Sequence, residues 1–290
     1  MLPVSRTNIV FAILGVALIS GGLFLWARDS NEASEIRIQN TQTLYAEVPP
    51  AVPTPADAAA TSTANMPVPI LVYHIVRPAY PTDSRAVTGL AHTPQVFDAE
   101  MKYLGEAGYR LTTFAALESH LTEGTPLPAN PVIISFDDGW SDQFTYAFPI
   151  LKKYHYAAEF FIFTNAIGRR GFLTWNDLRV MRDAGMIIGS HSRSHPFLTK
   201  IIDPARLWDE IDGSKLLIEK MLGITVNEFA YPFGQYGATT TALVAKAGYK
   251  AARGDYLKKG GTASLATLYA LGALNAPTTT AAFMLRFPKR

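Results

Sequence analysis

Residues 132–139 read Val-Ile-Ile-Ser-Phe-Asp-Asp-Gly, an apolar run that ends in two carboxylates and a glycine. A second apolar run, at residues 186–189, is followed by His191 and His195 in the segment His-Ser-Arg-Ser-His. Short runs that are apolar at nearly every position are typical of strands buried on both faces of a parallel sheet. A carboxylate and two imidazoles can hold a divalent metal ion. The two segments together therefore predict a hydrolytic metal centre.

The rest of the chain repeats this alternation of short apolar runs and amphipathic stretches. We expect strands at residues 70–73, 110–112, 132–136, 158–163, 186–189, 227–231, 249–252 and 268–271. Helical periodicity begins at Thr93 and recurs at residues 144–154, 175–184 and 205–222. About seven or eight strand–helix units predict an α/β fold with a closed or nearly closed parallel barrel.

Polar side chains follow several of these predicted strands directly. They are His74, Asp137, Asp138, His191 and His195, and the turn Pro232-Phe233-Gly234 lies in the same kind of position. In a parallel barrel, the carboxyl ends of the strands form one rim, and that rim carries the active site. We therefore expect these residues to meet there.

The chemistry of the predicted rim assigns different roles to the two adjacent aspartates. We expect Asp138, His191 and His195 to bind the metal and Asp137 to take a proton from the attacking water, although spacing alone allows Asp137 and Asp138 to exchange roles. His74 is a candidate general acid. Each motif also has a simpler interpretation, since Asp-Asp-Gly is common in turns and two histidines four apart are often solvated loop residues.

Three aromatic residues near the rim are candidates for contact with substrate. Trp140, Tyr231 and Phe233 could stack on a sugar ring, although aromatic side chains are also common in cores. The proline and glycine of Tyr231-Pro232-Phe233-Gly234 fix a tight turn. We expect this turn to direct the Phe233 backbone N–H at a developing oxyanion.

The amino terminus predicts a location for the protein. Residues 9–27 carry no charge and nearly match the roughly 20 residues that span a bilayer. We expect residues 1–27 to form a cytoplasmic stub and a signal-anchor helix, residues 28–66 a flexible Pro/Ala/Thr-rich linker, and residues 67–290 the catalytic domain. The domain would then lie on the periplasmic side of a bacterial inner membrane. Secretion after signal cleavage is the alternative.

Composition excludes several other classes of function. The net charge is +2 and no run of Lys or Arg is suited to nucleic acid, so we expect no nucleic-acid partner. The chain has no cysteine, which excludes disulfides, thiolate metal sites and a cysteine nucleophile.

The motifs resemble those of the polysaccharide deacetylases, the NodB homology domain of carbohydrate esterase family 4. Residues 135–139 (Ser-Phe-Asp-Asp-Gly) look like the first motif, residues 191–195 are similar to the second, and residues 231–234 to a variant of the third. The resemblance covers about residues 67–274. It implies a distorted (β/α)7 barrel, one Zn-type ion (Co, Ni or Fe being alternatives) on Asp138, His191 and His195, and Asp137 as base in removing acetyl groups from N-acetylated sugars. It also implies that Phe233 supplies the oxyanion N–H.

This chain departs from the family pattern at two places. The third motif commonly carries an arginine that orients the base, where residues 229–231 here read Phe-Ala-Tyr. The last motif commonly ends in a histidine acid, whereas no histidine follows His195. The Tyr73-His74 beginning resembles the exported branch that acts on poly-β-1,6-N-acetylglucosamine. We therefore expect His74 to replace the missing acid.

Other functions remain compatible with the sequence. The missing late histidine is compatible with a catalytically reduced member that binds glycan without hydrolysing it. Peptidoglycan and chitin-like oligomers are alternative substrates. Two histidines and one aspartate also form the facial triad of iron oxygenases, although their triads sit on a different scaffold.

Overall fold

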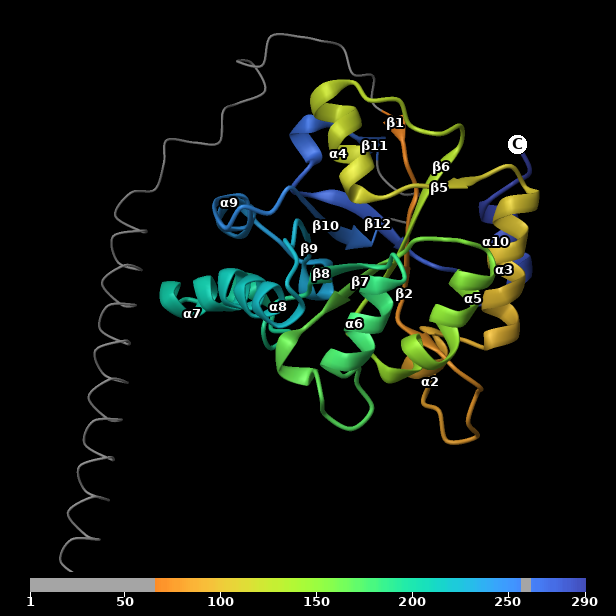
Figure 1. Cartoon of the computed structure of the whole chain (residues 1–290), viewed down its shortest axis with the longest axis horizontal. Coiled ribbons are helices and arrows are strands. Elements are labelled where there is room, and N and C mark those ends of the chain that lie inside the picture. Colours follow the sequence, from red (N-terminus) through yellow and green to blue (C-terminus); the bar gives the residue numbers. More distant parts are fainter. Residues whose placement is uncertain (1–65, 257–261) are drawn as a thin grey trace, which may run out of the picture. The chain divides into compact units, whose positions relative to one another are not determined.

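The core of the protein is a closed barrel of seven parallel strands. The computed structural model describes residues 66–256 and 262–290. The barrel strands follow one another in the order β2, β12, β10, β9, β8, β7 and β6, and β6 pairs back onto β2. Their bounds are β2 Ile70–Tyr73, β6 Pro131–Phe136, β7 Glu159–Ile162, β8 Ile187–Ser190, β9 Glu228–Ala230, β10 Ala251–Tyr256 and β12 Leu271–Asn275. The predicted α/β barrel is confirmed (Figure 1).

The barrel is irregular in two places. Strand β5 (Arg110–Leu111) pairs with the first residues of β6, while β7 pairs with Ser135 and Phe136 of β6. Strands β8 and β9 pair through Ser190 and Phe229. Two short pairs lie outside the barrel sheet, β1 (Met66–Pro67) with β11 (Thr262–Ala263) and β3 (Ile75–Val76) with β4 (Ala91–His92).

Helices connect the strands and cover the barrel. They are α2 Arg85–Thr88, α3 Pro94–Glu106, α4 Phe114–Glu123, α5 Phe148–Lys153, α6 Trp175–Asp183, α7 Pro204–Trp208, α8 Ser214–Leu222, α9 Ala238–Lys246 and α10 Thr280–Arg286. The described residues include two π-turns, η1 Gln143–Ala147 before α5 and η4 Asp209–Gly213 between α7 and α8. Short 3₁₀ turns are η2 Thr164–Ala166, η3 Leu198–Lys200, η5 Pro232–Gly234 and η6 Leu265–Thr267. Figure 1 shows α3, α5 and α10 together on one side of the barrel.

Alternate residues of each strand face the interior of the barrel. One buried apolar cluster contains inward-facing residues of six strands together with residues of α4, namely Ile70, Val72, Ile133, Phe161, Ala230, Ala251, Leu271, Ala273, Phe114, Leu117 and Leu121. Helix α4 therefore fills the interior from one end. Several of the polar side chains that face inward lie toward the opposite end of the barrel, where the strands finish.

The sequence-based bounds hold for most elements and shift in a few. The predicted strand at 249–252 lies at Ala251–Tyr256, and the one at 268–271 lies at Leu271–Asn275, because η6 occupies Leu265–Thr267. The predicted helices at 144–154 and 205–222 are each interrupted by a π-turn. No helix in residues 66–256 or 262–290 is long and apolar enough to cross a membrane. The anchor predicted at residues 9–27 lies outside the described residues.

Candidate active site

The strand alternation explains which side chains reach the site. Ile70 and Val72 face the interior, so the next residue of that parity is His74. On β6, Ile133 faces inward and the same parity leads through Ser135 to Asp137. Beyond Asp137 the chain turns, with a φ of 74° at Asp138 and 75° at Gly139. This turn separates the two aspartates, so Asp137 stays inside the barrel and Asp138 faces the pocket at its mouth.

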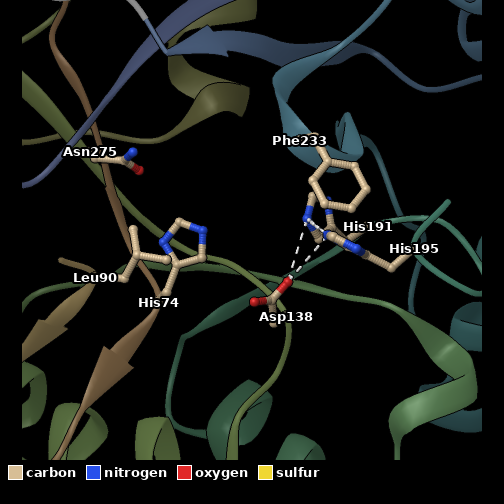
Figure 2. Close-up of a pocket in the computed structure, with 7 residues that line it drawn as sticks. All are labelled: His74, Leu90, Asp138, His191, His195, Phe233 and Asn275. Carbon is tan, nitrogen blue, oxygen red and sulfur yellow. Dashed lines mark hydrogen bonds and ion pairs between the residues drawn. The ribbon is translucent and has the colours of Figure 1, made fainter. Parts of the chain in front are cut away.

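A pocket of about 320 Å³ opens at this rim. His74, Leu90, Asp138, His195, Phe233 and Asn275 are among the residues that line it (Figure 2). Asp137 is absent from this lining and has no exposed surface. The five histidine and aspartate positions predicted to meet at one rim therefore do so, with four of them lining the pocket and Asp137 behind the others.

Asp138, His191 and His195 form a candidate metal centre. Their potential ligand atoms all lie within 4.8 Å of one another. The two Nε2 atoms are 3.2 Å apart, and Asp138 Oδ1 lies 3.8 Å from Nε2 of His191 and 3.4 Å from Nε2 of His195. Two nitrogens bound tetrahedrally at roughly 2.0–2.1 Å from one ion would be about 3.3 Å apart. The donor set therefore fits a divalent ion.

Neighbouring groups orient these ligands. His191 Nδ1 lies 2.7 Å from the carbonyl oxygen of Ala230. Because a carbonyl oxygen only accepts, Nδ1 carries the proton and Nε2 keeps its lone pair toward the ligand cluster. Trp140 Nε1 donates to Asp138 Oδ2 at 3.0 Å, which leaves Oδ1 facing the two imidazoles.

A buried glutamate stabilises the unusual backbone conformation of residues 191–195, the loop that carries the two histidines. Ser192 and His195 have φ values of 68° and 58°, in the left-handed region that costs energy for such residues. Glu210 of η4 accepts the backbone N–H groups of Arg193 and Ser194 at 3.0 and 2.8 Å and also the Ser194 hydroxyl. The π-turn thus directs a carboxylate at the loop that carries both histidine ligands.

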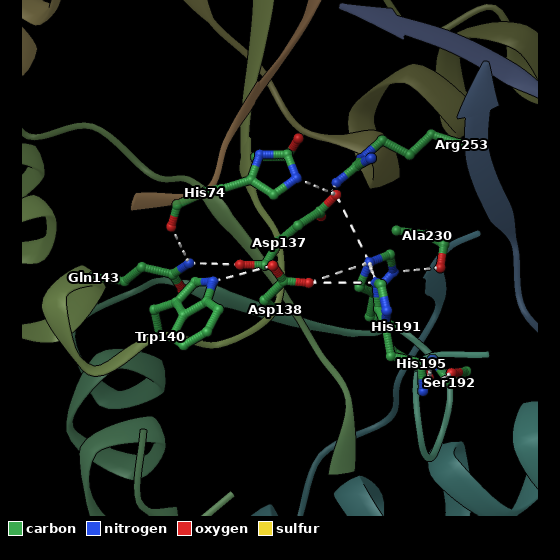
Figure 3. A network of polar contacts seen from close by, with 12 residues as sticks. His74, Asp137, Asp138, Trp140, Gln143, His191, Ser192, His195, Ala230 and Arg253 are labelled. Atoms are coloured by element: carbon green, nitrogen blue, oxygen red, sulfur yellow. Dashed lines mark hydrogen bonds and ion pairs between the residues drawn. The ribbon is translucent and has the colours of Figure 1, made fainter. Parts of the chain in front are cut away.

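Asp137 is paired with an arginine that the sequence analysis missed. Arg253 of β10 is fully buried, and its Nη2 donates to Asp137 Oδ1. Burial alone would raise the pKa of Asp137, but Arg253, His191 and His74 outweigh it and lower the pKa to about 2. The Asp137 carboxylate is therefore held in its ionised form. The expectation that this chain lacks an arginine to orient the base is wrong (Figure 3).

The register of the barrel explains how that arginine reaches the base. Arg253 on β10 is in register with Ala230 on β9. Ala230 belongs to residues 229–231, the segment where the family's third motif commonly carries an arginine. Residues in register on parallel strands face the same side. The small side chain of Ala230 leaves room for the guanidinium, which also lies 4.7 Å from the centre of the Phe161 ring.

His74 lies beside the base. Its Nε2 is 3.9 Å from Asp137 Oδ2. Burial lowers the pKa of His74, while Asp137 and Asp138 oppose that shift. His74 therefore lies at the rim beside Asp137, and its burial favours the neutral imidazole.

The three predicted substrate-binding aromatics are placed differently from one another. Phe233 lines the pocket with a φ of 59°, and its ring lies 4.5 Å from that of His195. Trp140 contacts the ligand Asp138 and stacks on Phe172 at 4.4 Å. The side chain of Tyr231 is fully buried, and its hydroxyl donates to the carbonyl of Tyr269 at 3.0 Å. It therefore packs beneath the surface and does not face the pocket.

Comparisons with known proteins agree with this geometry. A family model described as "Polysaccharide deacetylase" matches residues 124–252. YxkH of Bacillus subtilis, a candidate polysaccharide deacetylase, is 31% identical over 63% of this chain and 62% of its own length. The poly-β-1,6-N-acetyl-D-glucosamine N-deacetylase of Staphylococcus epidermidis is 31% identical over 37% of this chain and 39% of its own length. The chain thus spans less than two thirds of the length of these curated relatives.

A solved structure extends the likeness over the whole barrel. The Streptococcus pyogenes deacetylase PplD in complex with acetate superposes with a TM-score of 0.70 and 26% sequence identity. The match covers 78% of this chain and 100% of that one.

Proposed function

Since the chain belongs to the polysaccharide deacetylase family, we propose that it is a metal-dependent hydrolase that removes N-acetyl groups from an extracytoplasmic polysaccharide. The observation that carries the proposal is the buried Asp137–Arg253 pair directly behind the cluster of Asp138, His191 and His195. A metal cluster alone is compatible with simple ion binding. An adjacent carboxylate that is held ionised adds the proton acceptor that hydrolysis requires.

The residues divide the reaction between them. Asp138, His191 and His195 would hold the ion, with zinc the natural choice for two imidazoles and one carboxylate. When bound, the ion would polarise the acetyl carbonyl and lower the pKa of a water. Asp137 would take a proton from the attacking water as the water oxygen bonds to the carbonyl carbon.

Two further groups complete the hydrolysis. The Phe233 backbone N–H is proposed to stabilise the oxyanion, since its left-handed conformation turns the backbone at the pocket wall. His74 is proposed to donate a proton to the amine nitrogen as the C–N bond breaks, which leaves acetate and a free amino sugar. The neighbouring Asp137 raises the affinity of His74 for that proton.

We further propose poly-β-1,6-N-acetylglucosamine as the substrate. The support is the named activity of the Staphylococcus epidermidis relative, together with the Tyr73-His74 beginning. The catalytically reduced glycan-binding alternative is less well supported, because His74 occupies the rim beside Asp137 despite the absence of a late histidine.

Acetate release tests the proposal directly. The zinc-loaded chain would be incubated with β-1,6-linked N-acetylglucosamine oligomers, chitin oligomers and peptidoglycan fragments, beside Asp137→Asn, which keeps the metal ligands. We expect release from the β-1,6-linked oligomers, loss on chelation and loss in the variant. Preference for another glycan would overturn the substrate only. Release from none of them would overturn the enzyme.

A further inference from the structure

The two strands that carry the proton-transferring residues diverge at the rim. Strands β2 and β6 pair in parallel register from Ile70 with Ile133 to Tyr73 with Phe136. The backbone N–H of Asp137 donates to the Tyr73 carbonyl at 2.9 Å. Beyond this bond, His74 and Asp137 each present a backbone carbonyl, and two acceptors cannot bond one another.

The side chain of Gln143 joins these two carbonyls. Its Nε2 donates to the carbonyl oxygen of His74 at 2.9 Å and to that of Asp137 at 2.6 Å, and the residue is fully buried (Figure 3). Both partners are carbonyl oxygens, so the NH₂ end of the amide and not its oxygen must face them. A primary amide has two N–H donors on one nitrogen, which matches two diverging acceptors.

The local backbone directs this amide at the strand ends. Gln143 is the first residue of η1, the π-turn that precedes α5. One extra residue rotates a helical face by about 100°. The π-turn therefore lets Gln143 face the strand ends while Phe148 and Leu151 of α5 remain buried. The preceding residue, Asp142, accepts the backbone N–H of Val76 at 3.0 Å. This bond is a second link between the start of η1 and the chain that follows β2.

We propose that Gln143 is a positioning residue for the deacetylation, because its amide fixes His74 relative to Asp137. This inference rests on the proposed function of the site. Within residues 66–256 and 262–290, Gln143 makes no hydrogen bond to the candidate metal cluster of Asp138, His191 and His195. Its effect is therefore on proton transfer rather than on metal binding.

The expected effect is large in turnover and small in binding. The His74 and Asp137 side chains lie 3.9 Å apart, and a displacement of about 1 Å between reacting groups can cost roughly 10²-fold in rate. Gln143→Met keeps the length of the side chain and removes both donors. We expect kcat for acetate release to fall about 10- to 100-fold, with KM and the zinc Kd changed less than about threefold.

A matched control and a second background separate positioning from stability. Thr145→Val removes the bond from Thr145 Oγ1 to the Ser141 carbonyl on the same π-turn, away from the site, and should keep wild-type kcat. In a His74→Ala background, Gln143→Met should cost only a few-fold, because the relative placement of the two groups no longer matters. If Gln143→Met does not fold, Gln143→Asn retains the amide on a shorter stem and should show a smaller loss of the same kind.

Three results would overturn the inference. They are wild-type kcat in a folded Gln143→Met, an equal loss of kcat in both backgrounds, and a loss that follows the zinc Kd. Failure of the proposed function is distinguishable, since the unmodified chain would then release no acetate at all.

Discussion

Replacing Arg253 tests whether the barrel interior is built around an ionised base. Arg253 and Asp137 have no exposed side-chain surface, so their interaction is not screened by solvent. Arg253→Met keeps a long side chain and leaves Asp137 without its strongest cationic neighbour. Asp137→Asn leaves the guanidinium without its carboxylate. The double variant removes both charges.

The structure sets the size of the effect. With Arg253 present, the pKa of Asp137 is about 2 although burial acts to raise it, and the usual value is 3.8. Each pKa unit corresponds to about 1.4 kcal/mol, so the ionised form is favoured by roughly 2–3 kcal/mol. Breaking a buried pair by removing one partner costs about 3–5 kcal/mol of unfolding free energy. Because the residues touch, we expect the double variant to lose about 2–3 kcal/mol less than the sum of the single losses.

Urea unfolding of the four metal-free proteins at pH 7 measures this coupling. Arg253→Lys is the matched control, since it keeps the charge and should retain part of the stability. The pH dependence of acetate release provides a second measurement. Without Arg253 the pKa of Asp137 rises, so the base is protonated to a higher pH and the acid limb of kcat/KM moves upward. Additive losses in stability, or an unmoved acid limb, would refute the reasoning.

Two further predictions concern Trp140 and Glu100. Trp140→Phe keeps the stack on Phe172 but removes the N–H that orients Asp138, so zinc affinity should fall about 10- to 100-fold in calorimetry, and an unchanged Kd would contradict this role. Burial raises the pKa of Glu100 to about 8, against the opposing hydrogen bond from Tyr73. The folded state therefore binds that proton more tightly, and this stability is lost as pH rises from about 4.5 to about 8. Glu100→Gln should gain on the order of 3–5 kcal/mol relative to the unmodified chain between pH 5 and pH 8, and a constant difference would exclude the shift.

The sequence predicts which residues lie at the rim because the position directly after a strand is a local feature of the chain. Once residues 132–136 and 70–73 are recognised as strands, Asp137 and His74 fall directly beyond their carboxyl ends. The separation of Asp137 from Asp138 also follows from the glycine after them, which indicates a turn. These features need no knowledge of which strands are neighbours.

The supporting residues depend on neighbours far away in the chain, and the sequence analysis missed them for that reason. Arg253 lies 116 residues from Asp137, and its role appears only when β10 is placed beside β9. The predicted strand ended at residue 252, one position before it. A signal was present, since an arginine at the end of an apolar run requires a buried counterion. Gln143 and Glu210 gave less signal, because π-turns have no recognised sequence pattern.

Closure of the barrel brings the proposed acid His74 close to the end of the last barrel strand. Strand β2 is the first barrel strand and β12 the last, yet they are neighbours, with Asn275 in register with Val72. A side chain that follows β2 and one that follows β12 therefore reach the same side of the pocket, which both His74 and Asn275 line. An acid can be supplied from either end of the chain without moving the site. His74→Ala should accordingly remove most acetate release while the zinc Kd stays unchanged, and His74→Ala with Asn275→His should recover part of it. Full activity in the single variant would return the question of the acid to the residues around β12.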